Sequence, residues 1–184
     1  MESTQTNKPP QFFHKYFLLA TLLPLILVFD QWTKYWIHTR LRLYEAIPVI
    51  EGFFNITYVR NTGAAFGMLA NADPSFRKPF FIIVPLIALS SILVLLRRLP
   101  PYQIKTNLPL VLILSGALGN LIDRFVYGFV VDFLSFFHAD IGQFPAFNVA
   151  DSAISVGVAF LMLEMFRNPN ALEPPTSPTL PTST

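Results

Sequence analysis

Two aspartates in this chain are each preceded, three residues earlier, by an asparagine: Asn120 stands before Asp123 and Asn148 before Asp151. A spacing of three places both members of a pair on one face of a helix. Two carboxylates held close together cannot both ionise easily, so they can share one proton. One then acts as a general base towards water while the other acts as a general acid. This chemistry is typical of aspartyl proteases.

Each aspartate near a helix end also has a structural interpretation. Asp30 could pair with Lys34 four residues later on the same helix. Asp123 beside Arg124 could mark a helix end at the membrane interface, and Asp151 could stabilise the start of its helix through the helix dipole. An ionisable group inside a membrane span costs about 2.5 to 3.5 kcal/mol on insertion, and such groups are by default functional candidates. Two of them converging from neighbouring spans favour a functional role.

Composition limits the other possible chemistries. The chain contains no cysteine and only three histidines, namely His14, His38 and His138. Thiolate metal sites and cysteine nucleophiles are therefore excluded, and we expect neither a metal nor a cofactor. The net charge of +2 is too small to indicate a nucleic-acid partner. Carboxylates are the remaining reactive groups.

The hydropathy pattern predicts four membrane-spanning helices. The chain has 184 residues and is 53% hydrophobic but only 13% charged. A bilayer core of roughly 30 Å needs about 20 helical residues. Stretches of this kind cover residues 16–37, 79–96, 108–124 and 149–166. They define one membrane domain over residues 16–166, an all-α polytopic bundle. The flanking residues 1–15 and 167–184 are expected to be disordered.

The order of the spans places the aspartates on one side of the membrane. Four spans bring both termini to the same side. Asp123 closes the third span, Asp151 opens the fourth and Asp30 stands near the exit of the first, so all three lie opposite the termini. The numbers of basic residues on the two sides are too similar for the positive-inside rule to fix the orientation. The short basic connection between spans two and three favours cytoplasmic termini.

The segment between the first two spans contains a predicted strand. Apolar or aromatic residues alternate with others over residues 54–59, with Asn61-Thr62-Gly63 as a turn signal after them. We expect this lobe to pack on the membrane surface. In the second external connection, solvation is the favoured interpretation of Asp132 and Asp140, with a structural role as the alternative for Asp132. His138 is interpreted as a loop or interfacial histidine.

From Asp30 to Phe166 the chain resembles the lipoprotein signal peptidases, also called signal peptidase II. The motifs that carry the resemblance are Asp30-Gln-x-x-Lys34, Asn61-x-Gly-Ala-Ala-Phe66, Gly116-Ala-Leu-Gly-Asn-Leu-Ile-Asp-Arg124, Val131-Asp-Phe133 and Phe147-Asn-Val-Ala-Asp-Ser152. They occur in the order and spacing of the family. Ser115 stands where many relatives have another glycine, a departure that concerns local packing more than chemistry.

The resemblance implies a four-transmembrane-helix bundle in the bacterial cytoplasmic (inner) membrane, with a small extracytoplasmic β-containing cradle. It implies cytoplasmic termini and an active site near the outer face. The implied partners are membrane lipids and diacylglyceryl-modified prolipoproteins, cleaved just before the lipidated Cys, with no obligatory protein partner. The matching positions are Asp123 and Asp151 for the catalytic pair, Asn61, Asn120, Arg124 and Asn148 for polar site positions, and Asp30 for a supporting one.

Two other function classes fit parts of the pattern. Intramembrane Asp and Asn residues also mark ion routes, as in a small ion- or proton-coupled transporter. A transporter would place polar residues near the bilayer midplane, whereas here they cluster at one end of the spans. A structural membrane adaptor is the third class, and cleavage of a lipidated precursor would distinguish it from a peptidase.

Overall fold

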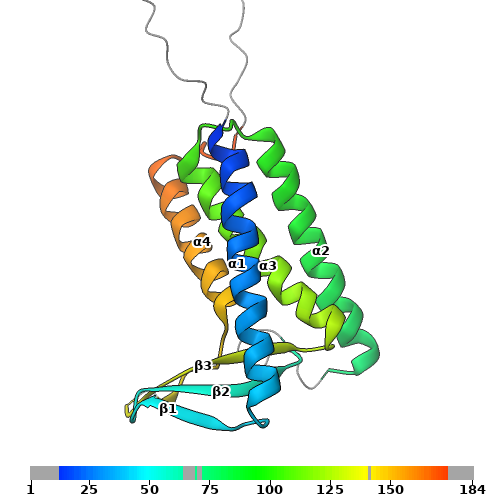
Figure 1. The fold of residues 1–184 in the computed structure, drawn as a ribbon. Helices are drawn as coiled ribbons and strands as arrows, with labels where there is room; N and C mark the ends of the chain where they lie inside the picture. Colours follow the sequence, from blue (N-terminus) through cyan, green and yellow to red (C-terminus); the bar gives the residue numbers. More distant parts are fainter. Residues whose placement is uncertain (1–12, 64–68, 70–71, 141, 174–184) are drawn as a thin grey trace, which may run out of the picture.

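In the computed structural model, residues 13–63, 69, 72–140 and 142–173 are described. Four long helices lie side by side, and an antiparallel sheet lies at one end of the bundle (Figure 1). The predicted four-helix membrane architecture with a small β lobe is thus confirmed. Residues 1–12 and 174–184, within the chain ends predicted to be disordered, lie outside the described residues.

The four helices are α1 (Phe13–Arg40), α2 (Pro74–Arg98), α3 (Ile104–Val126) and α4 (Val149–Arg167). Each is long and apolar enough to cross a membrane. The predicted spans lie inside these helices and are mostly shorter, because polar turns at the ends extend a helix beyond its apolar stretch. α1 begins and α4 ends at the same end of the bundle, opposite the sheet (Figure 1).

α3 is the central helix of the bundle. It packs against α1, α2 and α4, and more of its surface is buried than that of any of these helices. Its residues Leu110, Val111 and Leu114 form a hydrophobic core with Leu89 and Leu96 of α2. The polar side chains at its far end therefore project among the other helices.

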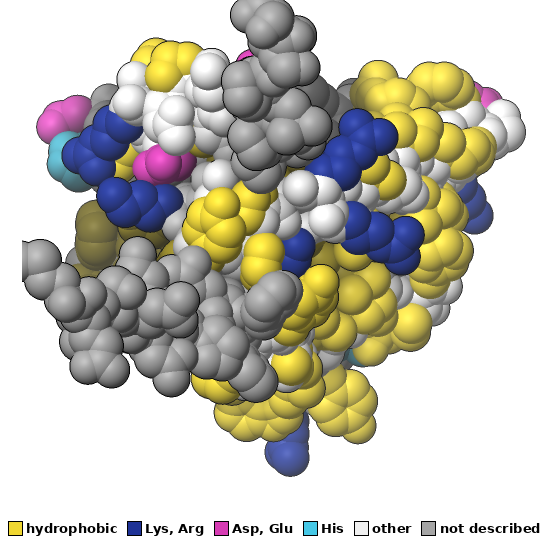
Figure 2. All heavy atoms as spheres, turned by 90° about the horizontal axis from the view of Figure 1, so that it is seen from above, with side chains coloured by type: hydrophobic (Ala, Val, Ile, Leu, Met, Phe, Trp, Pro, Cys, Tyr) yellow, Lys and Arg dark blue, Asp and Glu magenta, His cyan; other side chains and the backbone are white. Residues whose placement is uncertain are grey.

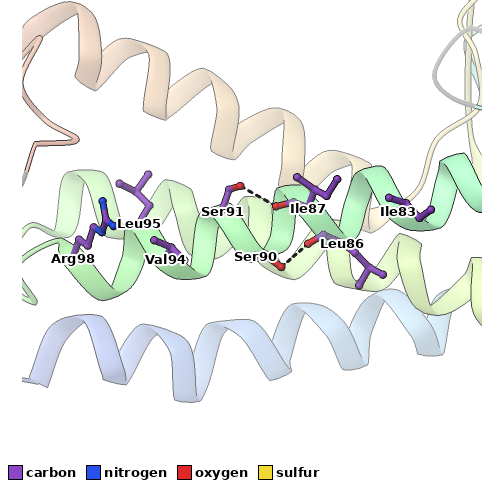
Figure 3. A pocket seen from close by; sticks show the side chains of 8 residues that line it. All are labelled: Ile83, Leu86, Ile87, Ser90, Ser91, Val94, Leu95 and Arg98. Carbon is purple, nitrogen blue, oxygen red and sulfur yellow. Dashed lines mark hydrogen bonds between the residues drawn. The ribbon is translucent and has the colours of Figure 1, made fainter.

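The outward surfaces of the bundle are apolar. Viewed from the end opposite the sheet, large areas of hydrophobic side chains surround scattered Lys and Arg side chains (Figure 2). On α2, the face turned away from the core forms an open groove that runs from Ile83 to Arg98 (Figure 3). Exposed apolar faces of this kind suit contact with lipid tails.

The sheet consists of β1 (Ala46–Ile50), β2 (Phe54–Asn61), β3 (Val130–His138) and β4 (Gly142–Gln143), in that spatial order. The strand predicted at residues 54–59 is confirmed and extends to Asn61. The sheet joins the bundle through a second apolar core, made of Ile37, Leu41, Tyr58, Val131 and Phe133. This core holds the start of β3 beneath the ends of the helices.

Two glycines of α3 allow close approach of its neighbours. A Cβ at Gly116 would overlap the carbonyl oxygen of Ala150 in α4, and one at Gly119 would lie 2.5 Å from the Oδ2 of Asp30 in α1. Both glycines therefore serve close helix packing. Gly119 additionally makes room for a carboxylate between α1 and α3.

Beyond α4, residues 168–173 form hydrogen-bonded turns, in which the N–H of Ala171 donates to the carbonyl of Asn168. Ala171 is buried, and Leu172 packs against the helical core. The sequence pattern places these residues in the C-terminal tail, which is predicted to begin at residue 167.

Candidate active site

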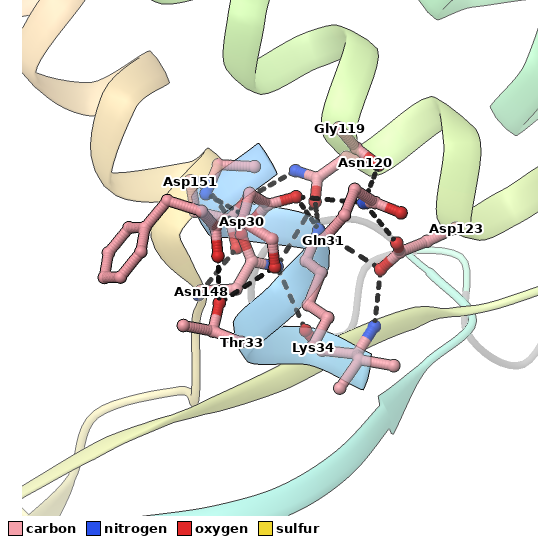
Figure 4. Close-up of polar contacts among 12 residues, drawn as sticks. Asp30, Gln31, Thr33, Lys34, Gly119, Asn120, Asp123, Asn148 and Asp151 are labelled. Atoms are coloured by element: carbon pink, nitrogen blue, oxygen red, sulfur yellow. Dashed lines mark hydrogen bonds and ion pairs between the residues drawn. The ribbon is translucent and has the colours of Figure 1, made fainter. Parts of the chain in front are cut away.

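Polar side chains from three helices and one strand meet at the sheet end of the bundle (Figure 4). They come from the last third of α1, the end of α3, the start of α4 and the start of β3. The members of this polar cluster are Asp30, Gln31, Lys34, Asn120, Asp123, Asp132, Asn148 and Asp151, and the backbone N–H of Val131 also joins it. Both predicted catalytic aspartates belong to it.

Asp123 is fully buried and surrounded by donors. The Nζ of Lys34 lies 3.1 Å from its Oδ2, which also accepts a hydrogen bond from the N–H of Val131 at 3.0 Å. The Nε2 of Gln31 donates to its Oδ1 at 2.9 Å. A cation and two neutral donors on one carboxylate stabilise its negative charge.

Asp151 is held by the first turn of α4. Asn148 is the N-cap, and the two residues form a reciprocal capping box: the N–H of Asp151 donates to Asn148 Oδ1 at 2.9 Å, and the N–H of Asn148 donates to Asp151 Oδ2 at 3.3 Å. The side chain of Asn120 donates to Asp151 Oδ1 at 2.7 Å. Unlike Asp123, Asp151 is only partly buried.

Asn120 links the two aspartates. Its Oδ1 accepts from Lys34 at 3.0 Å and from Asn148 at 3.2 Å, while its amide donates to Asp151. Lys34 in turn contacts Asp123. A path of polar contacts therefore runs from Asp123 through Lys34 and Asn120 to Asp151.

Asp30 has the structural contact predicted from its spacing. It pairs with Lys34 at 2.8 Å. Its other oxygen accepts a hydrogen bond from the N–H of Ala150 at 2.9 Å. Because Ala150 is the second residue of α4, Asp30 fastens α1 to the start of the helix that carries Asp151.

Arg124 and Asn61 lie at the margin of the cluster. Arg124 donates to the carbonyl oxygens of Asn120 at 3.3 Å and Gly63 at 3.2 Å. Asn61 donates to Asp132 Oδ2 at 2.9 Å. Asn61 thus reaches the site through Asp132, whereas the charge of Arg124 interacts with those of Asp151, Asp132 and Asp123. Residues 64–66, the last part of the motif that starts at Asn61, lie outside the described residues.

The solvated position favoured for Asp132 is wrong. Only 1% of Asp132 is exposed, and its Oδ1 accepts from the side chain of Asn148 at 2.7 Å. The register of β3 against β2, which pairs Asp132 with Val59, turns this side chain inward. Burial raises the pKa of Asp132 to about 7, with the negative charge of Asp151 as a further cause. By contrast, His138 and Asp140 are exposed, as predicted.

Sequence reasoning missed Gln31 as a member of the site and treated Lys34 only as a partner of Asp30. The signal for Lys34 was present in the sequence. A lysine near the end of a span becomes buried when the helices pack around it, and a buried lysine needs a partner of opposite charge. For Gln31, the available signal was its place in the motif Asp30-Gln-x-x-Lys34.

Fold and site together define the chain as a membrane aspartic endopeptidase, with its carboxylates at one end of a four-helix bundle. The family model described as Signal peptidase (SPase) II matches residues 22–167. The chain belongs to the signal peptidase II family.

Individual relatives and solved structures agree with this assignment. The lipoprotein signal peptidase of Geobacter sulfurreducens is 54% identical over 141 residues, covering 77% of this chain and 86% of that protein. That of Syntrophus aciditrophicus is 49% identical and covers 78% of this chain and 88% of its own. A bacterial membrane enzyme solved by the in meso method at 2.3 Å resolution is 31% identical, with a TM-score of 0.74 and coverage of 86% and 93%.

The buried ion pairs lead to a prediction for stability. Lys34→Met leaves Asp30 and Asp123 without their shared cation, so we expect the free energy of unfolding in detergent to fall by about 3 to 5 kcal/mol. Adding Asp30→Asn to this variant should restore part of the loss. Lys105→Met, at an exposed position on α3, is the control and should change stability little. Wild-type stability of the Lys34 variant would contradict this view of the cluster.

Asp132 leads to a prediction for pH dependence. Its pKa rises from an ordinary value of 3.8 to about 7 in the folded protein, so folding favours its protonated form. The resulting contribution to stability is complete below about pH 4 and is lost as pH rises through about 7. Asp132→Asn should therefore gain stability relative to the wild type across this range, measured by thermal unfolding. Exposed Asp140→Asn should show no such trend, and a flat difference for Asp132→Asn would refute the prediction.

Proposed function

We propose that the chain removes signal peptides from prolipoproteins by cleaving just before a diacylglyceryl-modified Cys, with Asp123 and Asp151 as the catalytic pair. Membership of the signal peptidase II family supports the reaction. The observation that carries the residue assignment is the shared polar cluster, in which Asn120 and Lys34 connect carboxylates from two different helices. Two carboxylates at one site supply both a general base and a general acid.

The two aspartates have different environments, and we assign their roles accordingly. Because Lys34 contacts Asp123, we assign to Asp123 the role of the base that draws a proton from the attacking water. Asp151, partly exposed and bound by the neutral amide of Asn120, donates a proton to the oxygen of the scissile carbonyl. The roles then reverse when a proton passes to the departing amine.

The remaining predicted residues act as positioning groups in this proposal. Asn120 and Asn148 hold Asp151, while Asp30 holds Lys34 and the start of α4. Asn61 steadies Asp132, and Arg124 connects the end of α3 to Gly63. The reaction described above uses water and carboxylates and requires neither a metal nor another cofactor.

The proposed location is the bacterial cytoplasmic membrane, with both termini cytoplasmic and the active site near the outer face. The polar cluster lies towards the sheet ends of the spans. A peptide bond next to a membrane-anchored residue of a substrate would lie at this depth. A lipid anchor on the Cys would present the neighbouring peptide bond at this depth. Membrane lipids are the second class of partner, and no further protein is needed for the reaction as proposed.

The catalytic pair is tested by isosteric substitution. Asp123→Asn and Asp151→Asn keep a side chain of the same shape that cannot exchange the required proton, so we expect turnover to fall by about 10²-fold to 10⁴-fold or more. Asp140→Asn, the same substitution at an exposed loop position, should leave turnover unchanged. The assay is cleavage of a diacylglyceryl-modified precursor by purified protein, with folding checked separately. A variant of either aspartate that retains substantial turnover would remove it from the pair.

Lipid dependence is tested with a membrane-inserted precursor that carries or lacks diacylglyceryl on its Cys. Burial of an acyl chain contributes about 0.8 kcal/mol per CH₂ to partitioning, so the two forms must be compared at equal surface density. We expect cleavage of the modified form only. Equal cleavage would exclude recognition of the lipid while leaving aspartyl protease chemistry intact.

A further inference from the structure

A second pocket lies beside the polar cluster, between the start of α2 and the end of α3. Its volume is about 360 Å³. α2 contributes Arg77, Lys78 and Phe81 to its wall, and α3 contributes Arg124 and Phe125. We propose that it binds the phosphate headgroup of an anionic phospholipid.

The charge of the lining favours an anion. Three of the described residues that line the pocket are cationic and none is acidic. Arg124 donates to the backbone carbonyl oxygens of Asn120 and Gly63, and its charge also interacts with those of Asp151, Asp132 and Asp123. Its guanidinium group also lies 5.2 Å from the centre of the Phe81 ring, which fixes its orientation. Arginine and lysine side chains around one cavity match the oxygens of a phosphate group.

The depth of the pocket favours a lipid as the source of that phosphate. α2 begins at Pro74 and α3 ends at Val126, so Arg77 lies in the first turn of one span and Arg124 in the last turn of another. Headgroups occupy this level of a bilayer, and Lys and Arg near the surface attract anionic lipids. Phe125 and Tyr127 add the aromatic lining typical of the membrane interface.

The pocket also differs from the groove on the outer face of α2. That groove lies on the opposite face of the helix and contains a single cation, Arg98, among apolar and serine side chains. A generic lipid-facing surface of this type would not select a headgroup. The pocket beside Arg124 combines three cations with a less open space than the groove, so it is the better candidate for selective binding.

The test compares lipid binding by the full chain and by variants, using native mass spectrometry of the detergent-solubilised protein. The probes are a short-chain phosphatidylglycerol, the matching phosphatidylcholine and inorganic phosphate. The variants are Arg77→Gln with Lys78→Gln, and Lys78→Gln alone in case the double variant folds poorly. The control is Arg97→Gln with Arg98→Gln, which removes the same charge from the other end of α2.

We expect the dissociation constant for phosphatidylglycerol to rise at least tenfold in the double variant, by about threefold or more in Lys78→Gln, and less than twofold in the control. Equal weakening in the double variant and the control would indicate surface attraction alone and would overturn the proposal. Unchanged affinity in both pocket variants would do the same, as would equal affinity for the two lipids. Binding of inorganic phosphate as tight as that of the lipid would assign the pocket to a soluble anion instead. The measurement does not involve cleavage, so it is independent of the proposed peptidase reaction.

Discussion

The ammonium group of Lys34 is the contact on which the site depends. It is almost inaccessible to solvent and lies within 3.1 Å of oxygens from Asp30, Asn120 and Asp123. Removing such ions from water costs several kcal/mol each, and the cost is recovered only where the geometry is good and the remaining lone pairs are bonded. α1 and α3 must therefore keep a fixed position relative to each other. Asp30 extends this requirement to α4 through the N–H of Ala150.

The sheet takes part in the same network. The N–H of Val131 donates to Asp123, and Asp132 accepts hydrogen bonds from Asn148 and Asn61. The start of β3 thus adds hydrogen-bond partners for buried polar groups of α3 and α4. A change in the register of β3 would turn Asp132 away from the site, so the sheet helps to position the helices' carboxylates as well as covering them.

The two aspartates differ in exposure as well as in partners. Asp123 is enclosed by a cation and two neutral donors, whereas Asp151 is partly exposed and contacts neutral groups. This asymmetry in exposure and partners suits the proposed division into base and acid. Asp132, whose pKa is raised to about 7, adds a third carboxyl group that need not be charged near neutral pH. The cluster can thereby hold several aspartates without full mutual repulsion.

Much of this protein was determined by the sequence itself. Hydropathy and span length predicted the four helices, and parity placed Asp30, Asp123 and Asp151 at one end, because each helix must cross the bilayer once. The i,i+4 pairing of Asp30 with Lys34 also followed from local geometry. The tertiary structure decided the rest. The contact of Lys34 with Asp123, the bridge through Asn120 and the burial of Asp132 depend on which faces of separate elements meet, and local periodicity in the sequence does not encode the register of one strand against another.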